Sequence, residues 1–357
     1  MNPLESELHY VFADTLPDTG RSLEVAPGVR WLRMGLPFAL NHINLWLLED
    51  EHELPDGSVQ RGWTVVDCGI ANDATRAAWE QIFEHELQGL PVLRVIATHC
   101  HPDHVGLAAW LCERWNAPLM MTVGEYAFAR IMSAGLPGAD GPSMLPHFRL
   151  HGLTDPEMIA GLEGRKNYYP SLVPAVPNAF LRLEEAQPIQ IGGHAWRVIS
   201  GTGHSPEHAA LFCESLNVLI SGDMVLPRIS TNTSVFAIEP EADAVGNFLD
   251  SLKKFLPLPA DVLVLPSHGK PFRGLHQRIA QLQAHHADRL AEVRQACATP
   301  RSAAEIVPMM FPRALDAHQL SFAMGEALAH LHRLWIAGEL KRTQDADGVM
   351  RFVRQKD

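Results

Sequence analysis

Short apolar runs separated by turn residues dominate the opening of the chain. The runs cover residues 29–34, 44–48 and 63–67, and turn-forming residues such as Pro55, Asp56 and Gly57 lie between them. Apolar runs of this length with such boundaries are typical of β-strands. Residues 28–67 are therefore predicted to form a β-rich opening.

A helical spacing of apolar residues follows, and the two patterns then alternate. Residues 73–88 have the periodicity of an amphipathic helix, residues 92–97 form an apolar run that stops at a polar cluster, and residues 107–115 are again helical in pattern. Strand-like runs return later, at residues 196–199, 209–212, 218–220 and 262–265. This alternation predicts a layered α/β fold.

The middle of the chain, residues 125–187, breaks this regularity. Its periodicity is weak, and it is rich in glycine and proline, including Pro142, Pro170 and Pro177. A long insert of this kind usually forms a lid or the wall of a substrate pocket. We therefore predict an irregular insert that sets the choice of substrate.

The last part of the chain has a different organisation. A helix is predicted over residues 275–296, and beyond Pro300 two more helical segments, the second ending with residues 328–336, precede a hairpin around Asp347 and Gly348. This order predicts a winged-helix module at residues 295–357, behind a larger catalytic domain at residues 1–294. The module has eight Lys or Arg against seven Asp or Glu. We therefore expect it to close or support the pocket rather than to bind duplex DNA.

Composition narrows the class of protein further. The chain of 357 residues has 29 Lys or Arg against 41 Asp or Glu, and its net charge of −12 disfavours a broad basic face for nucleic acid. It has neither an apolar run long enough to span a membrane nor a leader pattern, so we predict a soluble cytoplasmic protein without membrane contacts. Five cysteines form no Cys-x-x-Cys pair, which disfavours a disulfide framework. The oligomeric state is not indicated by any of these features.

The polar cluster after the run at residues 92–97 carries the main chemical signal. It holds His99, His101, Asp103 and His104 within six residues. In an extended loop, residues i and i+2 point the same way, so His99 and His101 can reach one metal ion, while Asp103 and His104 face a neighbouring position. A helix cap needs one such residue and not four. The cluster therefore predicts metal binding.

Two metal ions require further donors, and later strands supply candidates. His204, Asp223 and His268 each follow a strand-like run. Any one of them alone is more often a turn residue. A layered α/β fold, however, places its active site at the ends of strands, so we expect all three to join the first cluster.

With these residues the chain resembles the metallo-β-lactamase-fold hydrolase superfamily, whose motif is His-x-His-x-Asp-His followed by single His, Asp and His ligands. The resemblance implies an αββα sandwich with two divalent metal ions, zinc first and iron or manganese as alternatives. It implies that the first metal is held by His99, His101 and His204, the second by Asp103, His104 and His268, and that Asp223 bridges them.

Two further residues match supporting positions of the family. Asp67 follows a strand-like run and corresponds to the family's supporting acid, and His208 corresponds to a second histidine of its Gly-x-x-Pro-x-His pattern. A ligating histidine usually needs a partner for its other ring nitrogen. We therefore expect Asp67 and His208 to support the ligands rather than to bind metal.

Charge at such a centre supports hydrolysis. Two divalent cations outweigh the charges of Asp103 and Asp223, the two carboxylates expected to be catalytic, and a bridging hydroxide leaves the centre positive. Such a centre lowers the pKa of bound water and polarises a carbonyl or phosphoryl oxygen. The sequence thus favours hydrolysis of a small-molecule acyl substrate, namely an ester, a thioester or a lactone.

Other assignments within the superfamily stay open. Residues 227–232, residues 267–271 and the C-terminal module resemble the subgroup that contains glyoxalase II-like hydrolases and the lactamase-like RNA endonuclease, so cleavage of single-stranded RNA is one alternative. A persulfide dioxygenase that uses one iron is another. Arg165, Lys166, Tyr168 and Tyr169 in the insert are candidates for the pocket lining, and either tyrosine could protonate a leaving group.

Overall fold

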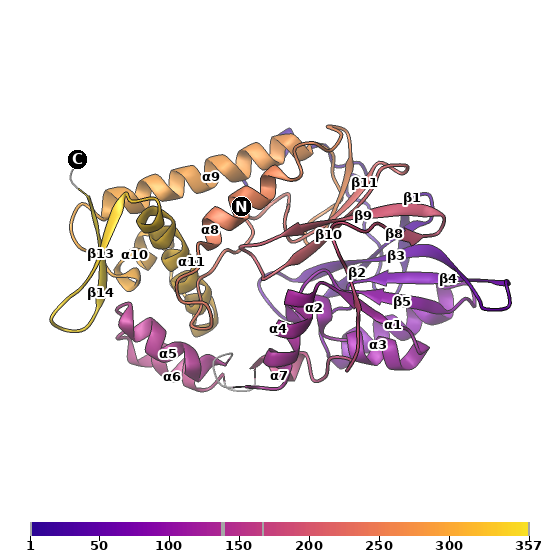
Figure 1. Cartoon of the computed structure of the whole chain (residues 1–357), viewed down its shortest axis with the longest axis horizontal. Coiled ribbons are helices and arrows are strands. Elements are labelled where there is room, and N and C mark those ends of the chain that lie inside the picture. The colour runs from indigo at the N-terminus through magenta and orange to yellow at the C-terminus, as the bar shows by residue number, and fades with distance from the viewer. Residues whose placement is uncertain (1, 137–139, 166–167, 356–357) are drawn as a thin grey trace.

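Two mixed β-sheets pack face to face in the computed structural model, which describes residues 2–136, 140–165 and 168–355 (Figure 1). Among these residues, the first sheet runs in order from β1 to β7: Ser22–Ala26 (β1), Val29–Gly35 (β2), His42–Glu53 (β3), Val59–Val66 (β4), Val92–Ile96 (β5), Leu119–Met121 (β6) and Leu181–Arg182 (β7). The pairs from β1 to β4 are antiparallel, and the pairs from β4 to β7 are parallel.

The second sheet has the order β12-β11-β10-β9-β8 over the same described residues. Its strands are Ile189–Ile191 (β8), His194–Gly201 (β9), His208–Cys213 (β10), Val218–Gly222 (β11) and Leu263–Pro266 (β12). β11 and β12 are parallel, and the other pairs are antiparallel. Because β10 is antiparallel to both of its neighbours, β9, β11 and β12 all run in one direction.

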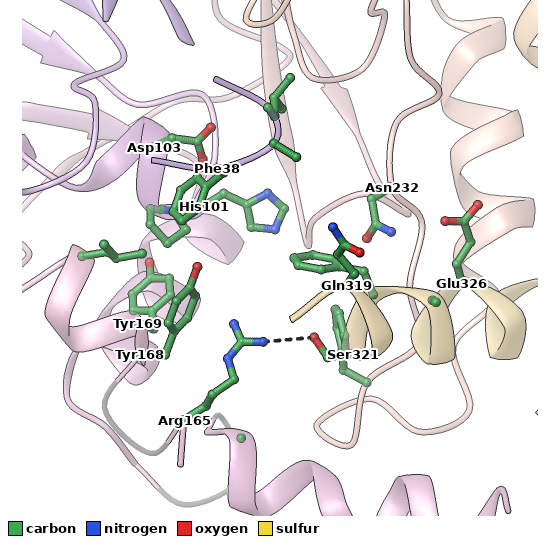
Figure 2. Close-up of a pocket in the computed structure, with 18 of the residues that line it drawn as sticks. Phe38, His101, Asp103, Arg165, Tyr168, Tyr169, Asn232, Gln319, Ser321 and Glu326 are labelled. Carbon is green, nitrogen blue, oxygen red and sulfur yellow. Dashed lines mark hydrogen bonds between the residues drawn. The ribbon is translucent and has the colours of Figure 1, made fainter. Parts of the chain in front are cut away.

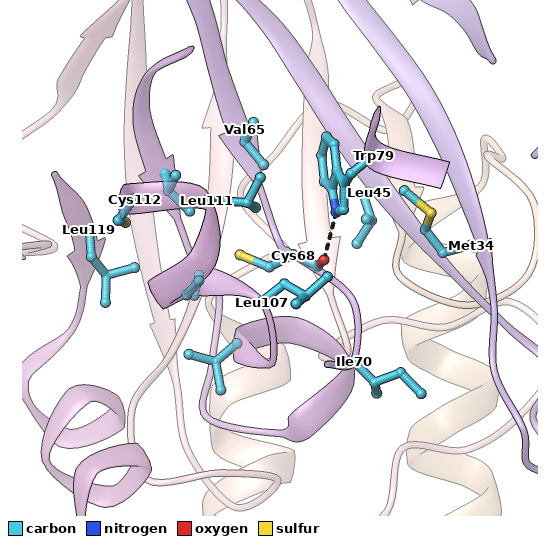
Figure 3. Close-up of a cluster of buried hydrophobic side chains, with 14 of the residues drawn as sticks. Met34, Leu45, Val65, Cys68, Ile70, Trp79, Leu107, Leu111, Cys112 and Leu119 are labelled. Atoms are coloured by element: carbon cyan, nitrogen blue, oxygen red, sulfur yellow. Dashed lines mark hydrogen bonds between the residues drawn. The ribbon is translucent and has the colours of Figure 1, made fainter. Parts of the chain in front are cut away.

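Helices cover the outer face of each sheet. Those that pack on the first sheet are Asp73–His85 (α1), Ala108–Trp115 (α3), Val123–Ser133 (α4) and Tyr168–Leu172 (α7), and Figure 3 shows part of the apolar cluster beneath them. Those on the second sheet are Ala244–Lys253 (α8) and the first half of Leu275–Ala296 (α9). A third cluster, which includes Trp46 and Leu211, fills the space between the sheets. The predicted layered α/β fold is therefore confirmed.

The insert differs from the irregular segment that its composition predicts. It contains α4 and α7 and, between them, Gly141–Leu150 (α5) and Pro156–Glu163 (α6). Proline misled the prediction because Pro142 and Pro156 lie in the first helical positions, where the missing N–H costs no hydrogen bond. The insert is thus largely helical.

The insert shares its apolar core with the C-terminal region. Leu145, Phe148 and Leu162 of α5 and α6 belong to one buried cluster with residues of Ala303–Met310 (α10), Ala317–Ile336 (α11) and the second half of α9. The hairpin of Leu340–Gln344 (β13) and Met350–Arg354 (β14) completes this region. The predicted helices and hairpin are confirmed, whereas the winged-helix assignment and the boundary after residue 294 stay predictions. The boundary falls inside α9, which continues from the sheet to this cluster (Figure 1).

Two shorter elements complete the description. A 3₁₀ turn occupies Glu5–Glu7, and the short helix Pro102–Val105 (α2) follows the first half of the His-rich motif. Over the described ranges, every helix is too short or too polar to cross a membrane.

The shared cluster gives a prediction about stability. Phe148 is fully buried, so the Phe148→Ala substitution removes its packing and is expected to lower the free energy of unfolding by about 3–5 kcal/mol. Thermal and denaturant unfolding measure this change. The matched control is Leu150→Ala on the same helix, since Leu150 is 38% exposed. Equal losses in both variants would contradict the packing of the insert on the C-terminal region.

Candidate metal centre

The histidine and aspartate side chains of the motif meet at one edge of the two sheets. Asp67 follows β4, His99 follows β5, His204 follows β9, Asp223 follows β11 and His268 follows β12. Strands that run in the same direction bring their carboxyl ends to a common edge, which is where α/β folds bind ligands. The topology therefore explains why residues so far apart in sequence converge.

The first group of donors contains His99, His101, His204 and Asp223. His99 Nε2 lies 2.9 Å from His101 Nδ1 and 3.2 Å from His204 Nε2, and His204 Nε2 lies 3.4 Å from Asp223 Oδ2. One nitrogen or oxygen of each residue lies within 4.8 Å of the others. This spacing suits ligands around a single ion.

The second group contains Asp103, His104 and His268, and Asp223 reaches it as well. Asp103 Oδ2 lies 3.7 Å from His104 Nε2 and 3.4 Å from His268 Nε2. Asp223 Oδ1 lies 3.6 Å from His104 Nε2 and 3.5 Å from His268 Nε2. Asp223 therefore faces both groups, one with each carboxylate oxygen, and this is the place that the resemblance predicts for a bridging ligand.

Hydrogen bonds orient three of the imidazole rings. The Nδ1 atom of His104 lies 2.8 Å from Asp67 Oδ2, that of His204 lies 2.8 Å from the Asn232 carbonyl, and that of His268 lies 2.8 Å from the His42 carbonyl. Carbonyl and carboxylate oxygens only accept, so each Nδ1 carries the proton and donates it. Each Nε2 then faces the centre, which is the position that a metal-binding nitrogen requires.

The donor set fits divalent metal ions. His104 Nε2 and Asp223 Oδ1 are buried and have no hydrogen-bond partner among the described residues. Burying such groups without a partner is costly, and a cation between them removes that cost. Imidazole and carboxylate donors in groups of three and four suit zinc, and iron or manganese also accept them. The two His/Asp groups are thus consistent with a dinuclear site, whereas the identity of the metal stays a prediction.

The electrostatics of the two groups differ. Burial lowers the pKa values of His99 and His101 well below the usual range, which favours the neutral form that binds metal. Burial also disfavours charge on His104, but the carboxylates of Asp67, Asp103 and Asp223 outweigh it and raise the pKa of that ring to about 10. Carboxylates therefore dominate the surroundings of His104, whereas burial dominates those of His99 and His101.

Asp67 is fixed by its backbone and by its neighbours. It is fully buried with a φ of 63°, and its carboxylate accepts hydrogen bonds from the Thr98 backbone N–H at 2.8 Å, from Thr98 Oγ1 and from His104 Nδ1. It thus connects the end of β4 to the loop after β5. The structure places Asp67 where the sequence predicts a supporting acid.

His208 bonds to the backbone, and its ring lies beside that of His99 at a centroid distance of 4.9 Å. Its Nε2 accepts a hydrogen bond from the Asp223 backbone N–H at 3.1 Å, so this nitrogen is already used. Gly222, with a φ of 54°, is needed beside it, because a Cβ atom there would lie 2.3 Å from His208 Nε2. His208 therefore positions the loop that carries Asp223.

Sequence reasoning missed Glu125, which holds two loops of the centre together. This fully buried carboxylate accepts hydrogen bonds from the Cys100 N–H at 2.8 Å, the Ser205 hydroxyl at 2.6 Å and the Glu207 N–H at 2.6 Å. The carbonyls of His42 and Asn232 were missed as well. Nothing in the sequence marks these groups, because their role depends on contacts between segments that are distant in the chain.

A pocket of about 760 Å³ opens above the centre. Figure 2 shows its upper part at His101 and its far side at Gln319 and Ser321 of the C-terminal region. Apolar side chains from the β2–β3 loop, the insert, the β11–α8 loop and the C-terminal region form most of its wall, including Leu36, Phe38, Phe128, Met144, Phe236 and Phe311. The C-terminal region therefore closes one side of the pocket, as its charge balance suggested.

The insert residues singled out in the sequence are found in this pocket. Arg165, Tyr168 and Tyr169 line it, whereas Lys166 lies outside the described residues. The Tyr169 hydroxyl donates a hydrogen bond to the Cys100 carbonyl. This tyrosine therefore positions the His-rich loop, and its proton is committed to that contact.

Comparisons with known proteins agree with this geometry. A family model described as the metallo-β-lactamase superfamily matches residues 58–268, and a second model, described as a metallo-β-lactamase-like C-terminal domain, matches residues 290–355. Among curated proteins, the chain is similar to "Probable metallo-hydrolase YqjP" of Bacillus subtilis (strain 168), with 24% identity over 309 residues that cover 84% of this chain and 90% of the relative.

Two solved structures extend the similarity. A β-lactamase domain protein from Burkholderia ambifaria is 59% identical, with a TM-score of 0.92 and coverage of 99% of this chain and 100% of that chain. A metallo-β-lactamase family protein from Thermus thermophilus is 28% identical, with a TM-score of 0.75 and coverage of 93% of this chain and 100% of that chain. The similarity therefore includes the C-terminal region, not only the two sheets.

The geometry predicts two metal ions per chain. The donors form two groups, and seven donors exceed the needs of one tetrahedral site. Elemental analysis of protein purified without a nickel column measures the number of metal ions per chain.

The Asp223→Asn variant is expected to lose more metal and more activity than His208→Ala, because Asp223 faces both groups. A folded His208→Ala variant that retains less metal and less activity than Asp223→Asn would contradict the assignment of Asp223 as the shared ligand. One iron per chain with oxygen consumption on a persulfide would favour the dioxygenase alternative.

Asp67 provides a test of ligand orientation. Asparagine tolerates the left-handed φ of this position, so Asp67→Asn keeps the backbone. Its amide oxygen can still accept from the Thr98 N–H, but its amide nitrogen is a donor and cannot accept the proton of His104 Nδ1. Metal affinity, measured by competition with a chelator, is expected to fall by about 10- to 100-fold. The control is Asp73→Asn at the exposed start of α1. Unchanged affinity in Asp67→Asn would show that this contact does not orient His104.

Proposed function

Because this chain belongs to the metallo-β-lactamase superfamily, we propose that it is a metal-dependent hydrolase whose substrate is an ester, a thioester or a lactone with an apolar body. The observation that carries the proposal is the position of the two donor groups beside a largely apolar pocket of about 760 Å³. A pocket of this size holds a small molecule. Its wall suits a substrate with apolar groups on at least one side of the bond that is cleaved.

Each part of the site has a separate task in this proposal. Bound divalent ions would act as Lewis acids on a substrate oxygen and would lower the pKa of a water molecule. Asp67, His208 and Glu125 hold the donor loops in place through the buried contacts described above. The apolar wall excludes water from the reacting bond, which strengthens electrostatic interactions there.

The leaving group follows from the hydrogen bonds of the pocket. The Tyr169 proton is committed to the Cys100 carbonyl, so Tyr169 is a poor candidate for general acid. A thiolate or an alkoxide of low pKa needs no such acid. Tyr168 also lines the pocket and stays the candidate acid for a simple alkyl ester, whereas thioesters, lactones and activated esters need neither tyrosine.

The pocket is less suited to RNA. Apart from histidine, the basic side chains among the described residues of its wall are Arg165 and Arg313. A single strand of several nucleotides presents one phosphate per residue and usually binds along a basic groove with stacking platforms. The apolar wall and the net charge of −12 therefore favour a small acyl substrate.

Salt dependence distinguishes the two substrate classes. We expect kcat/KM for an acyl thioester or a homoserine lactone to change only modestly between low and physiological salt. For single-stranded RNA, affinity would fall by about 0.7 log units per log unit of salt for each phosphate neutralised. Both classes are assayed with one metal-loaded sample, and the metal-stripped protein serves as the control. Efficient metal-dependent cleavage of a short unstructured RNA with steep salt dependence, and no turnover of any ester, would overturn the proposal.

A further inference from the structure

Arg165 places a positive charge inside the apolar pocket. Its guanidinium stacks on the Tyr168 ring at 4.1 Å from the ring centroid, and its Nη1 donates a hydrogen bond to Ser321 Oγ at 3.3 Å. Figure 2 shows the side chain extending from the insert into the pocket, with the guanidinium between these two residues. Arg165 is thus held by groups from both the insert and α11, and neither group carries a negative charge.

The guanidinium has no anionic partner in the part of the chain that the structure describes. Burial lowers the pKa of Arg165, and Asp316 acts on it only from beyond ion-pair distance. A half-buried guanidinium loses part of its hydration, and this loss is usually offset by a carboxylate or a phosphate. Here Asp316 and Tyr168 supply only part of that offset and no described carboxylate forms an ion pair with the guanidinium, which points to an anion that arrives with the substrate.

The carboxylates of the pocket wall have other tasks. The Asp140 carboxylate caps α5 by accepting from the Ser143 N–H at 2.8 Å, and the Asp316 carboxylate caps α11 by accepting from the Gln319 N–H at 2.8 Å. Glu326 accepts a hydrogen bond from the Asn232 side chain, and burial raises its pKa to about 7. Asp103 and Asp223 belong to the metal centre. None of these described carboxylates forms an ion pair with Arg165, and Asp316 acts on it from a longer distance.

We infer that Arg165 binds an anionic group of the substrate, a carboxylate or a phosphate, while the apolar wall holds the rest of the molecule and the reacting carbonyl lies at the metal centre. This inference rests on the proposed function and specifies its substrate class as an amphipathic acyl compound with one anionic end. Arginine suits this task because its planar fork matches both oxyanions. Stacking on Tyr168 limits its motion, so little conformational entropy is lost on binding.

Matched substrates test the inference. The first set consists of thioesters of one thiol whose acyl chains have equal length and end in a methyl group, a carboxylate or a phosphate. In the second set the acyl chain is constant and neutral, and the thiol carries the anionic group instead. Wild type is expected to prefer at least one anionic member over its neutral partner, by about 10- to 100-fold in kcat/KM, the usual size of a hydrogen bond to a charged group. Comparison of the carboxylate-ended with the phosphate-ended substrates shows which of the two oxyanions Arg165 prefers.

Substitutions identify the residue responsible. Arg165→Met is expected to lose the preference for the anionic member, and Arg165→Lys to retain only part of it, because lysine lacks the planar fork. The control is Arg149→Met, which removes one positive charge from the exposed face of α5 outside the pocket and should keep the preference. A wild type without preference, or the same preference in Arg165→Met, would overturn the inference.

A binding measurement separates this inference from the proposed function. Isothermal calorimetry compares adipate with hexanoate, since both place one carboxylate at the metal centre and only adipate has a second. Tighter binding of adipate in wild type and in Arg149→Met, but not in Arg165→Met, supports the anion site even if no thioester is hydrolysed. Hydrolysis of thioesters without any anion dependence would instead leave the function standing and remove the inference.

Discussion

The metal centre depends on one constraint, which is that each inward-facing imidazole nitrogen must be free to bind metal while the other ring nitrogen has a partner. The protein meets this constraint on the outer side of the rings. His104, His204 and His268 each place Nδ1 against an acceptor that cannot donate, namely the Asp67 carboxylate and two backbone carbonyls. The Nε2 atom of each ring is thereby directed inward before any ion binds. A change in any of these acceptors is therefore expected to alter the orientation of a ligating ring, although the ligand itself is unchanged.

The same constraint explains the support behind the loops. Acceptors orient a ring only if the loops around the centre keep their relative positions. The loops after β5 and β9 are held together by the buried Glu125 carboxylate. A buried carboxylate with three hydrogen bonds has most of its desolvation cost offset, and breaking one of them leaves a group without a partner. Glu125 therefore joins the first sheet to the second at the level of the centre.

How much of the fold and of the metal centre could be predicted from the sequence depends on whether the residues involved are close together in the chain. The His-x-His-x-Asp-His loop is contiguous, and the later donors follow recognisable apolar strands, so the donor set and the layered fold could be predicted. The acceptors at His42 and Asn232 are backbone carbonyls, which carry no signature of residue type. The helices of the insert were missed because prolines at their first positions resemble breakers, and the core they share with α11 is formed by residues more than a hundred positions away.

The pocket and the centre are stabilised by different parts of the molecule. Donor positions are set by the ends of strands, whereas the far wall belongs to the cluster shared by the insert and the C-terminal region. Substitutions in that cluster are therefore expected to reshape the space for substrate first, and α11 connects them to the donors through the loop at Asn232.

Asn232 is where these two parts meet. Its carbonyl accepts from His204, its side chain bonds to Glu326 of α11, and nearby the Val235 N–H donates to the Gly325 carbonyl at 3.0 Å. One loop thus connects α11 with the ligand His204, so substitutions that displace α11 are expected to disturb this ligand as well as the pocket wall.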